Sequence, residues 1–431
     1  MANNKTVSKD FFATATRMTL TDLKKFLVNV VLPTDPRKLA PIVIWSAPGE
    51  AKSALVESVF NDTERGLKSV ILSQIGPLDA NGLAHIVKDT VGNKESEVTD
   101  FTPTLTFGRG RHHLFLDELN NAAPGTLAAV QNLLSSKKIG GDDFNDIHII
   151  AACNPPSTNS LANDLNYPTV SRCINIVLDY TLDDFISYAL STGSIHPAIV
   201  AFHRKANGTF LRANWSFSNS NMSVPEPGPN EPFPCPRSWS LASNVIQALT
   251  GAKTNAHVNY SLLKPLVEGS VGIAAANEFA TTYAYMEKLP DVEKIFSGEL
   301  DGSKKKLTNE VAVQFITMTA LINYCIGEIN RISSESIKCD TRSKESAAYK
   351  ILAGLHRSVV YMGEATTAEL ASMTLQSICG VLRNSSDRIS AEWMTKLLQG
   401  VDAKNGLTRE AIIKYAVNSG TTDQNIQNSI G

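Results

Sequence analysis

The sequence feature that most constrains the fold is a short apolar run that leads through a small loop into a helical pattern. Residues 41–45 read Pro-Ile-Val-Ile-Trp, which is typical of a buried strand. Residues 54–60 carry apolar side chains at helical spacing, and only the loop at 46–53 separates the two segments. A strand joined so tightly to a helix favours an α/β arrangement.

Further apolar runs extend this pattern to a sheet. Strand candidates follow at residues 69–72, 113–116, 148–152 and 173–178, with helical patterns among them. Strands that alternate with helices predict a parallel sheet covered on both faces. Residues 137–147 also predict a hairpin that leads into the fourth strand.

The composition changes after the fifth strand candidate. Residues 207–236 are rich in Asn, Ser, Pro and Gly, which predicts a linker or exposed loop. Beyond them the patterns are helical, with almost no strand signal. The helix candidates span residues 238–250, 262–289, 310–332, 355–382 and 391–398. We therefore expect an α/β core over 1–205 (with 1–40 as a lead-in), a linker over 206–232, a helical lid over 233–305 and a helical C-terminal region over 306–431.

Composition narrows the classes of function. The 431 residues carry 40 basic and 42 acidic side chains, and this near balance argues against a nucleic-acid partner. The sequence shows no apolar run of the length that crosses a membrane, and residues 1–10 lack the apolar stretch of a signal peptide. The six cysteines are scattered, without the paired spacing of a zinc site or redox dithiol. We expect a reduced, cytoplasmic protein with no membrane partner.

The loop at 46–53 reads Ser-Ala-Pro-Gly-Glu-Ala-Lys-Ser and has the context of a phosphate-binding loop. Backbone N–H groups and the helix N-terminus can surround phosphates, Lys52 can reach the β- and γ-phosphates, and Ser53 can ligate Mg²⁺. The usual pattern has glycine where this chain has Ser46 and Ala51, so the alternative is a plain strand–turn–helix corner whose lysine faces solvent. The predicted nucleotide-binding residues of this segment are Pro48, Gly49, Glu50, Ala51, Lys52, Ser53 and Ala54.

The third strand candidate ends in an acidic pair. Asp117 is expected to hold Mg²⁺, and Glu118 to polarise the attacking water. Taken singly, such a pair is more often a solvated strand end. The phosphate loop and this pair nevertheless follow strands of one predicted sheet, and open α/β sheets bind ligands at the carboxyl edge of their strands.

Three more polar residues fit the same site. Asn154 follows the fourth strand, where an amide can hydrogen-bond both the lytic water and the γ-phosphate. Arg172 precedes the fifth strand and can point toward the γ-phosphate held by a neighbouring subunit. Arg237 lies at a proline-fixed helix start in the helical region. The ordinary alternatives are a turn asparagine, a surface arginine and an exposed charge at a helix start.

Together these motifs resemble the AAA+ ATPases, and most of all the MoxR-like group. Residues 117–122 (Asp-Glu-Leu-Asn-Asn-Ala) look like an extended Walker B motif, and residues 72–79, with 82–83 after them, resemble the second-strand motif of the group. Residues 236–239 (Pro-Arg-Ser-Trp) are similar to its sensor 2 motif, and residues 272–279 with 289–291 to its helical lid. The resemblance extends from about residue 42 to residue 300.

The resemblance implies an αβα P-loop core with a parallel sheet, followed by an all-helical lid and C-terminal helices. It further implies ATP and Mg²⁺ bound between the subunits of a ring, usually a hexamer. The ring would remodel a protein partner in a chaperone-like way, in many members a partner with a von Willebrand A domain. The implied roles are Walker A for Lys52 and Ser53, Walker B for Asp117 and Glu118, sensor 1 for Asn154, arginine finger for Arg172 and sensor 2 for Arg237.

The segment between residues 79 and 108 shows no clear element. In the MoxR-like group, this region carries an insert that faces the ring pore. On that basis, four side chains are candidates for contact with a substrate: Lys88, Lys94, Phe101 and Phe107. A flexible surface loop is the favoured alternative.

Three hypotheses for the function remain. The first is an active ATPase that remodels a protein partner. The second is a nucleotide-gated scaffold with little hydrolysis, which the missing glycines at Ser46 and Ala51 suggest. The third is a motor that acts on nucleic acid, which the balanced charge disfavours.

Overall fold

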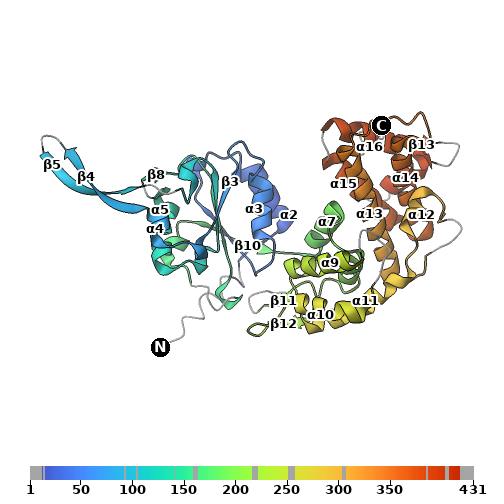
Figure 1. The fold of residues 1–431 in the computed structure, drawn as a ribbon, viewed down its shortest axis with the longest axis horizontal. Helices are drawn as coiled ribbons and strands as arrows, with labels where there is room; N and C mark the ends of the chain where they lie inside the picture. The colour runs from blue at the N-terminus through green and yellow to red at the C-terminus, as the bar shows by residue number, and fades with distance from the viewer. Residues whose placement is uncertain are drawn as a thin grey trace. The chain divides into compact units, whose positions relative to one another are not determined.

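The computed structural model describes residues 12, 15–91, 94–102, 105–139, 141–158, 164–215, 222–250, 258–302, 307–384, 387–402 and 407–417. The chain divides into two compact units (Figure 1). The first extends to Asp184, and the second holds most of the chain from Phe185 onward.

The first unit is built on a six-stranded parallel sheet. Its strands, in spatial order, are β1 (Arg17–Thr19), β10 (Ile174–Asp179), β2 (Ile42–Trp45), β9 (Ile149–Cys153), β6 (His113–Asp117) and β3 (Leu67–Ile71). Five of these are the strands expected from the sequence, so the prediction of an α/β fold with a parallel sheet is confirmed.

Helices cover the sheet on both faces (Figure 1): α2 (Leu20–Phe26) and α3 (Lys52–Phe60) lie on one side, α4 (Pro77–Asn81) and α5 (Pro124–Ser136) on the other. Side chains alternate across a strand, so every second residue of β2 faces the same helices. Ile42 and Ile44 accordingly pack in one core with Leu23 of α2 and with Val56 and Phe60 of α3. This core fixes α3, and with it the loop that precedes the helix.

The strand β1 was not expected, since it lies in the segment assigned as a lead-in. It pairs with β10, Arg17 opposite Val177. The carboxylate of Asp184, only 5% exposed, accepts hydrogen bonds from the backbone N–H groups of Leu20 (3.2 Å) and Thr21 (3.1 Å). A strand of three residues has too short a pattern to be found in a sequence, and its anchor is distant along the chain.

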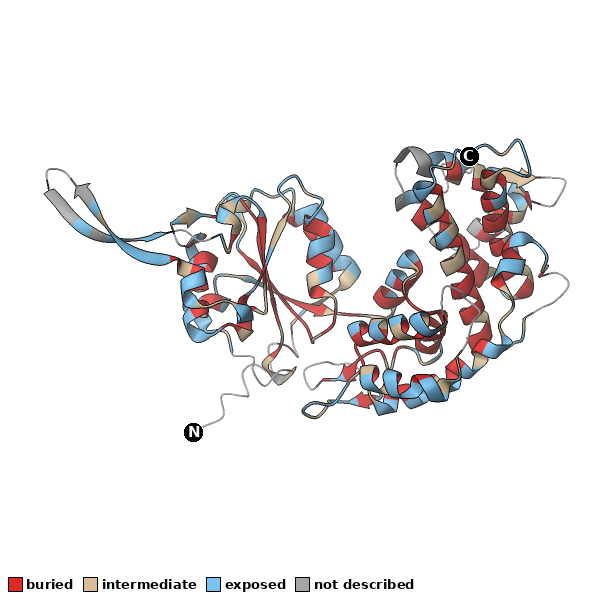
Figure 2. Cartoon of the chain, in the orientation of Figure 1, coloured by how far each residue is buried: buried red, intermediate tan, exposed pale blue. Residues whose placement is uncertain are grey.

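In the segment between residues 79 and 108, residues 83–91 and 94–102 form the strands of a long hairpin, which corrects the expectation of a surface loop. Strands β4 (Leu83–Val91) and β5 (Lys94–Thr102) pair in continuous antiparallel register and project from the unit (Figures 1 and 2). Ile86 and Phe101 are 71% and 41% exposed, and Lys88 is also exposed. Phe107 was wrongly grouped with the exposed candidates, because it is buried against Phe144, with ring centroids 6.4 Å apart. The side chain of Lys94 lies outside the described residues.

A second, short hairpin confirms the one predicted within residues 137–147. Its strands are β7 (Lys138–Ile139) and β8 (Asp142–Asp143). The backbone N–H of Phe144 donates to the carbonyl of Lys137 at 2.8 Å, where Lys137 has a left-handed φ of 54°. The hairpin therefore returns the chain from α5 toward β9.

The second unit is almost entirely helical. Its helices are α7 (Leu182–Thr192), α8 (Pro197–Lys205), α9 (Pro236–Thr250), α10 (Tyr260–Val271), α11 (Ile273–Tyr283), α12 (Val292–Ser297), α13 (Val311–Ser334), α14 (Ala347–Ala365), α15 (Ala368–Asn384), α16 (Asp387–Gln399) and α17 (Arg409–Val417). Two small strand pairs, β11 (Ala213–Asn214) with β12 (Val224–Pro225) and β13 (Gly400–Asp402) with β14 (Leu407–Thr408), were not expected. The candidate helix at 262–289 is divided at Gly272, whose φ of 83° suits glycine.

The helix α8 belongs to this unit, although the core was expected to extend to residue 205. Its apolar face packs on α11 and α13, and the side chain of Asn323 donates to the carbonyl of Ile195 at 3.1 Å. Within the described ranges, α13 is the one helix long and apolar enough to cross a bilayer. It packs against α8, α14 and α15, and most of its apolar side chains are buried, as in the core helix of a globular unit.

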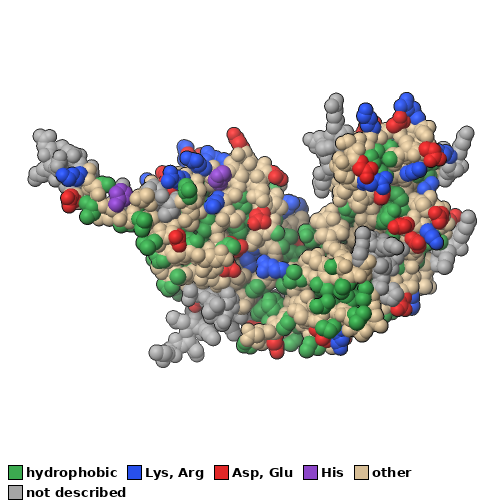
Figure 3. Space-filling model, viewed as in Figure 1, with side chains coloured by type: hydrophobic (Ala, Val, Ile, Leu, Met, Phe, Trp, Pro, Cys, Tyr) green, Lys and Arg blue, Asp and Glu red, His purple; other side chains and the backbone are tan. Residues whose placement is uncertain are grey.

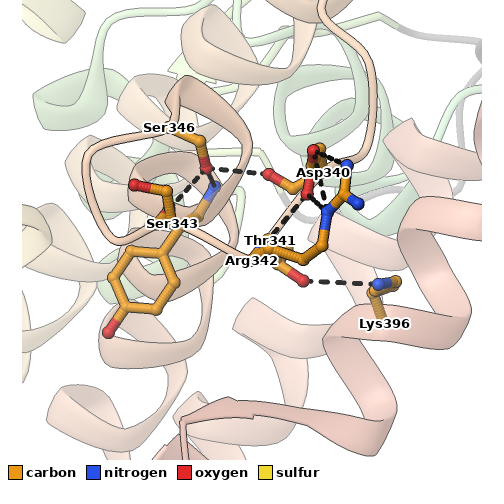
Figure 4. Close-up of polar contacts among 7 residues, drawn as sticks. Asp340, Thr341, Arg342, Ser343, Ser346 and Lys396 are labelled. Atoms are coloured by element: carbon orange, nitrogen blue, oxygen red, sulfur yellow. Dashed lines mark hydrogen bonds and ion pairs between the residues drawn. The ribbon is translucent and has the colours of Figure 1, made fainter.

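Polar contacts secure the connection between α13 and α14 (Figure 4). Arg342 forms an ion pair with Asp340 at 2.6 Å, and the hydroxyl of Ser346 donates to the carbonyl of Asp340 at 2.8 Å. Ser346 also accepts from the backbone N–H of Tyr349 and so caps α14. Lys396 of α16 donates to Thr341 at 3.3 Å, which ties this connection to the neighbouring helix.

Two stacked histidines at the amino edge of the sheet predict that acid destabilises the first unit. His113 and His148 stack with centroids 5.1 Å apart beside Phe60. Burial lowers the pKa of His113 to about 4, with smaller contributions from the neighbouring His148, Arg65 and His112. The unfolded chain takes up this proton near pH 6.5, before the folded chain does, so stability is lost as pH falls from about 6.5 toward 4.

The measurement is thermal unfolding at pH 7 and pH 5. His113→Gln removes the titrating ring while keeping an acceptor for the backbone N–H of His148, so the variant is expected to lose less stability than wild type between the two values. His85→Gln, at an exposed position on β4, is the control. Equal losses in wild type and His113→Gln would contradict the assignment.

Candidate functional site

The loop between β2 and α3, predicted to bind phosphates, contains two residues with a left-handed backbone. Gly49 has a φ of 78°, and Ala51, the residue before α3, has φ 62° and ψ 19°. The left-handed conformation costs an alanine about 1–2 kcal/mol, and glycine is the residue that adopts it freely. Ala51 therefore holds, with strain, a conformation that glycine would adopt freely.

Lys52 points into this loop. It is 8% exposed, and its ammonium donates to the carbonyl oxygens of Ser46 (2.9 Å) and Ala47 (3.1 Å) and to the side-chain carbonyl of Asn154 (2.8 Å). The hydroxyl of Ser46 is a further acceptor at 3.0 Å. A lysine that faces solvent is thereby ruled out. Serine at the first loop position adds an acceptor that glycine cannot provide.

The two predicted magnesium ligands meet. Ser53 lies in the first turn of α3 and Asp117 at the end of β6, and the serine hydroxyl donates to the aspartate carboxylate at 2.6 Å. Mg²⁺ takes oxygen ligands and is commonly held by one or two protein groups together with phosphates and waters, so this pair fits the ion. The other expected loop residues lie beside it: Gly49 and Glu50 are buried, Pro48 is half-buried and Ala54 is exposed on α3.

Glu118 follows Asp117 with a left-handed backbone, φ 54° and ψ 40°. Its backbone N–H donates to the Asp117 carboxylate at 2.9 Å, and its own carboxylate accepts a short hydrogen bond from the hydroxyl of Ser73. Ser73 lies just after β3, the strand beside β6. Ser73 was not predicted as a site residue. Its position just after a predicted strand, like that of Asp117 and Asn154, could have indicated it.

Asn154 reaches the same site because β9 lies between β2 and β6. The residue follows the last residue of β9, and its side chain contacts Lys52 as described. Its backbone is held by a residue that the sequence had not singled out: Asn120, fully buried, donates to the Asn154 carbonyl at 2.7 Å and accepts from the Asn154 N–H at 3.3 Å.

Arg172 lies at the opposite edge of the sheet. It precedes β10, and the backbone N–H of Ile174 donates to Pro41, just before β2, at 2.8 Å. The phosphate loop follows the other end of β2, four paired residues or roughly 13 Å away along the strand. Arg172 is exposed and donates to the carbonyl of Pro168 at 2.7 Å, beside Tyr167, which is 82% exposed. The structure does not bring Arg172 to the phosphate loop of its own chain.

Arg237 is the second residue of α9 and is exposed. The helix start is well fixed, because the backbone N–H of Cys235 donates to the Ser238 hydroxyl at 2.8 Å. Arg237 belongs to the second unit and the phosphate loop to the first, so its role toward a nucleotide stays a prediction.

The strain at Ala51 predicts that Ala51→Gly stabilises the first unit by about 0.5–1 kcal/mol, the left-handed penalty less the added entropy of the unfolded chain. Ala54→Gly, in the helical first turn of α3, is the matched control and should destabilise by about 0.5–1 kcal/mol. Chemical denaturation, followed at the transition of the first unit, measures both. A destabilised Ala51→Gly protein would show that the alanine methyl contributes packing that outweighs its strain.

The chain matches no protein-family model, and a search of curated proteins also finds no match. Function is therefore inferred from the residues and geometry of the chain itself.

Proposed function

We propose that this protein is a Mg²⁺-dependent ATPase of the AAA+ type, most similar to the MoxR-like group. The observation that carries the proposal is that four predicted residues converge at the carboxyl edge of one parallel sheet. Lys52 lies 2.8 Å from Asn154, and Ser53 lies 2.6 Å from Asp117. Ligand sites of open α/β sheets lie at this edge, and two independent contacts there are hard to reconcile with a simple turn.

Each residue then has a definite task. The loop N–H groups and the amino end of α3 bind the phosphates, and Lys52 neutralises their charge. Ser53 and Asp117 hold Mg²⁺, which when bound offsets the charge that develops on the transferred phosphoryl group. Glu118 accepts a hydrogen bond from the attacking water and aligns it, and the Asn154 amide contacts the water or the γ-phosphate.

The position of Arg172 supports a site shared between subunits. Because it lies at the edge opposite its own phosphate loop, it can complete a nucleotide site only in another copy of the chain. Tyr167 and Val170, 82% and 37% exposed, flank it, and exposed aromatic and arginine side chains together are typical of protein interfaces. We accordingly propose a homo-oligomeric ring, a hexamer by analogy with the MoxR-like group.

The substrate is proposed to be a protein, for which a partner with a von Willebrand A domain is the example that the group offers. The hairpin β4–β5 offers the exposed side chains of Ile86 and Phe101 to such a partner. All six cysteines carry free thiols, as in a reduced compartment, and a cytoplasmic location is part of the proposal.

One contact favours the second candidate, a nucleotide-gated scaffold with little hydrolysis. The Ser73 hydroxyl donates to one oxygen of the Glu118 carboxylate and so competes with the attacking water for this group. A nucleic-acid motor has less support: the net charge is −2, and acidic side chains lie among the basic ones on the face drawn in Figure 3.

The test is steady-state ATP hydrolysis as a function of protein concentration, with Lys52→Ala beside wild type. A shared site predicts that the specific activity rises with concentration and that the variant is inactive throughout. Wild-type protein that binds ATP and Mg²⁺ but shows no turnover in any assembly state would overturn the ATPase and favour the scaffold. Salt-sensitive DNA binding would favour the motor.

A further inference from the structure

We propose that Asn120 is a positioning residue for ATP hydrolysis: its side chain clamps the backbone of Asn154 and thereby aims the Asn154 amide at the γ-phosphate site. This inference rests on the proposed function. It assigns a role to a residue that contacts neither nucleotide nor metal.

The clamp replaces the sheet at the point where the sheet ends. The last paired residues of β6 and β9 are Leu116 and Ala151, and beyond them the two strands diverge to form the site. On its β2 side the ladder reaches Cys153, whose carbonyl accepts from the Ser46 N–H at 3.3 Å, whereas on its β6 side Asn154 lies past the last pair. The Asn120 side chain bonds both backbone groups of Asn154, its amide NH₂ to the carbonyl at 2.7 Å and its oxygen to the N–H at 3.3 Å.

Burial makes both bonds costly to lose. Asn120 is 0% exposed, so water cannot readily replace it. Asn154 itself is half-buried, so a peptide N–H or carbonyl that loses the Asn120 side chain must either move or recruit a water at a partly enclosed position. The side chain of Asn154 donates nothing to this clamp; its oxygen accepts instead from Lys52 at 2.8 Å. The backbone contact and the functional contact of Asn154 are therefore separate, and the first fixes the second.

The clamp also couples the two catalytic strand ends. Asn120 lies in the short turn Leu119–Asn121, directly after Glu118. A side chain in this turn that grips Asn154 holds the glutamate-bearing end of β6 at a set distance from the asparagine-bearing end of β9. Catalysis depends steeply on such distances, since a displacement of about 1 Å can cost about 10²-fold in rate.

The experiment is a double-mutant cycle on kcat with Asn120→Ala, Asn154→Ala and the double variant. We expect Asn120→Ala to lower kcat by about 10²-fold and to leave the dissociation constant for ATP within a few-fold, because the phosphate loop is untouched. In the Asn154→Ala background, the same change should have little further effect. Asn132→Ala, which removes an exposed amide on α5, is the control.

An Asn120→Leu variant separates positioning from packing. It fills the position with a side chain of similar shape and adds no charge beside Asp117 and Glu118, but it can neither donate to the Asn154 carbonyl nor accept from the Asn154 N–H. A packing role predicts near-wild-type kcat for this variant, whereas the clamp predicts a loss comparable with that of Asn120→Ala. Multiplicative losses in the cycle, or a fully active Asn120→Leu protein, would overturn the positioning role.

Hydrogen exchange at the Asn154 N–H makes the outcome independent of turnover. Asn120→Ala should exchange faster at this amide than wild type, and unchanged protection would show that the clamp does not operate in solution. Wild-type protein without ATP turnover would overturn the proposed function, and the positioning role with it. In that case, faster exchange in Asn120→Ala would still show that Asn120 protects the Asn154 N–H, although without a catalytic role.

Discussion

Glu118→Gln is expected to lower ATP turnover by about 10²–10⁴-fold while ATP binding is preserved, because the amide keeps the shape of the side chain but cannot accept the proton of the attacking water. The binding contacts of the loop are separate from this carboxylate, as Lys52 and Ser53 contact Asn154 and Asp117 instead. Single-turnover hydrolysis and the lifetime of bound ATP measure the two effects. The bound state should last correspondingly longer in the variant.

Ser73→Ala is the matched control, since it removes the hydroxyl that binds Glu118 without changing the carboxylate. The Ser73→Ala protein, in which the Glu118 carboxylate is free of this hydroxyl, should hydrolyse ATP at least as fast as wild type. A Glu118→Gln protein with wild-type turnover would remove Glu118 from the mechanism. If Glu118→Gln leaves the lifetime of bound nucleotide unchanged because wild type barely hydrolyses, the scaffold function is the better description.

Arg172→Ala is expected to lower turnover by about 10³-fold or more, the effect of removing an arginine that stabilises phosphoryl-transfer charge from a neighbouring subunit. The position of Arg172 also predicts how this variant behaves in a mixture with a second variant. Since Arg172 and Lys52 lie at opposite edges of the sheet, we predict that they serve different nucleotide sites of the proposed assembly. Each single variant should be inactive, yet a mixture of Arg172→Ala and Lys52→Ala protein should regain activity.

The regained activity has a predictable size. At a head-to-tail interface, random mixing pairs an intact Lys52 with an intact Arg172 in roughly a quarter of the sites. Arg111→Ala, which removes another exposed arginine of the first unit, should remain active. An inactive mixture whose subunits demonstrably exchange would show that both residues serve the same site, which the sheet geometry does not allow, or that Arg172 acts only in assembly.

The sequence by itself determined the frame of the first unit. Each of the five predicted strands is a short apolar run, and such a run indicates a strand without information from the rest of the chain. The positions of Lys52, Ser53, Asp117 and Asn154 followed from one rule, that parallel strands end at a common edge. The order of the strands was not needed to place these residues at one site, but the hydrogen bonds Lys52–Asn154 and Ser53–Asp117 were not predicted.

Only the tertiary structure decided which side chains complete the site. Ser73 and Asn120 act through partners on other strands, and a sequence contains no local signal for a contact that depends on strand order. The strand β1 could not be predicted for the same reason, because its three residues are held by contacts with β10 and Asp184, which are distant in the sequence. The left-handed Ala51 was hidden for a different reason: the local preference of alanine opposes it, and the packing of α3 against the sheet holds the loop in that conformation.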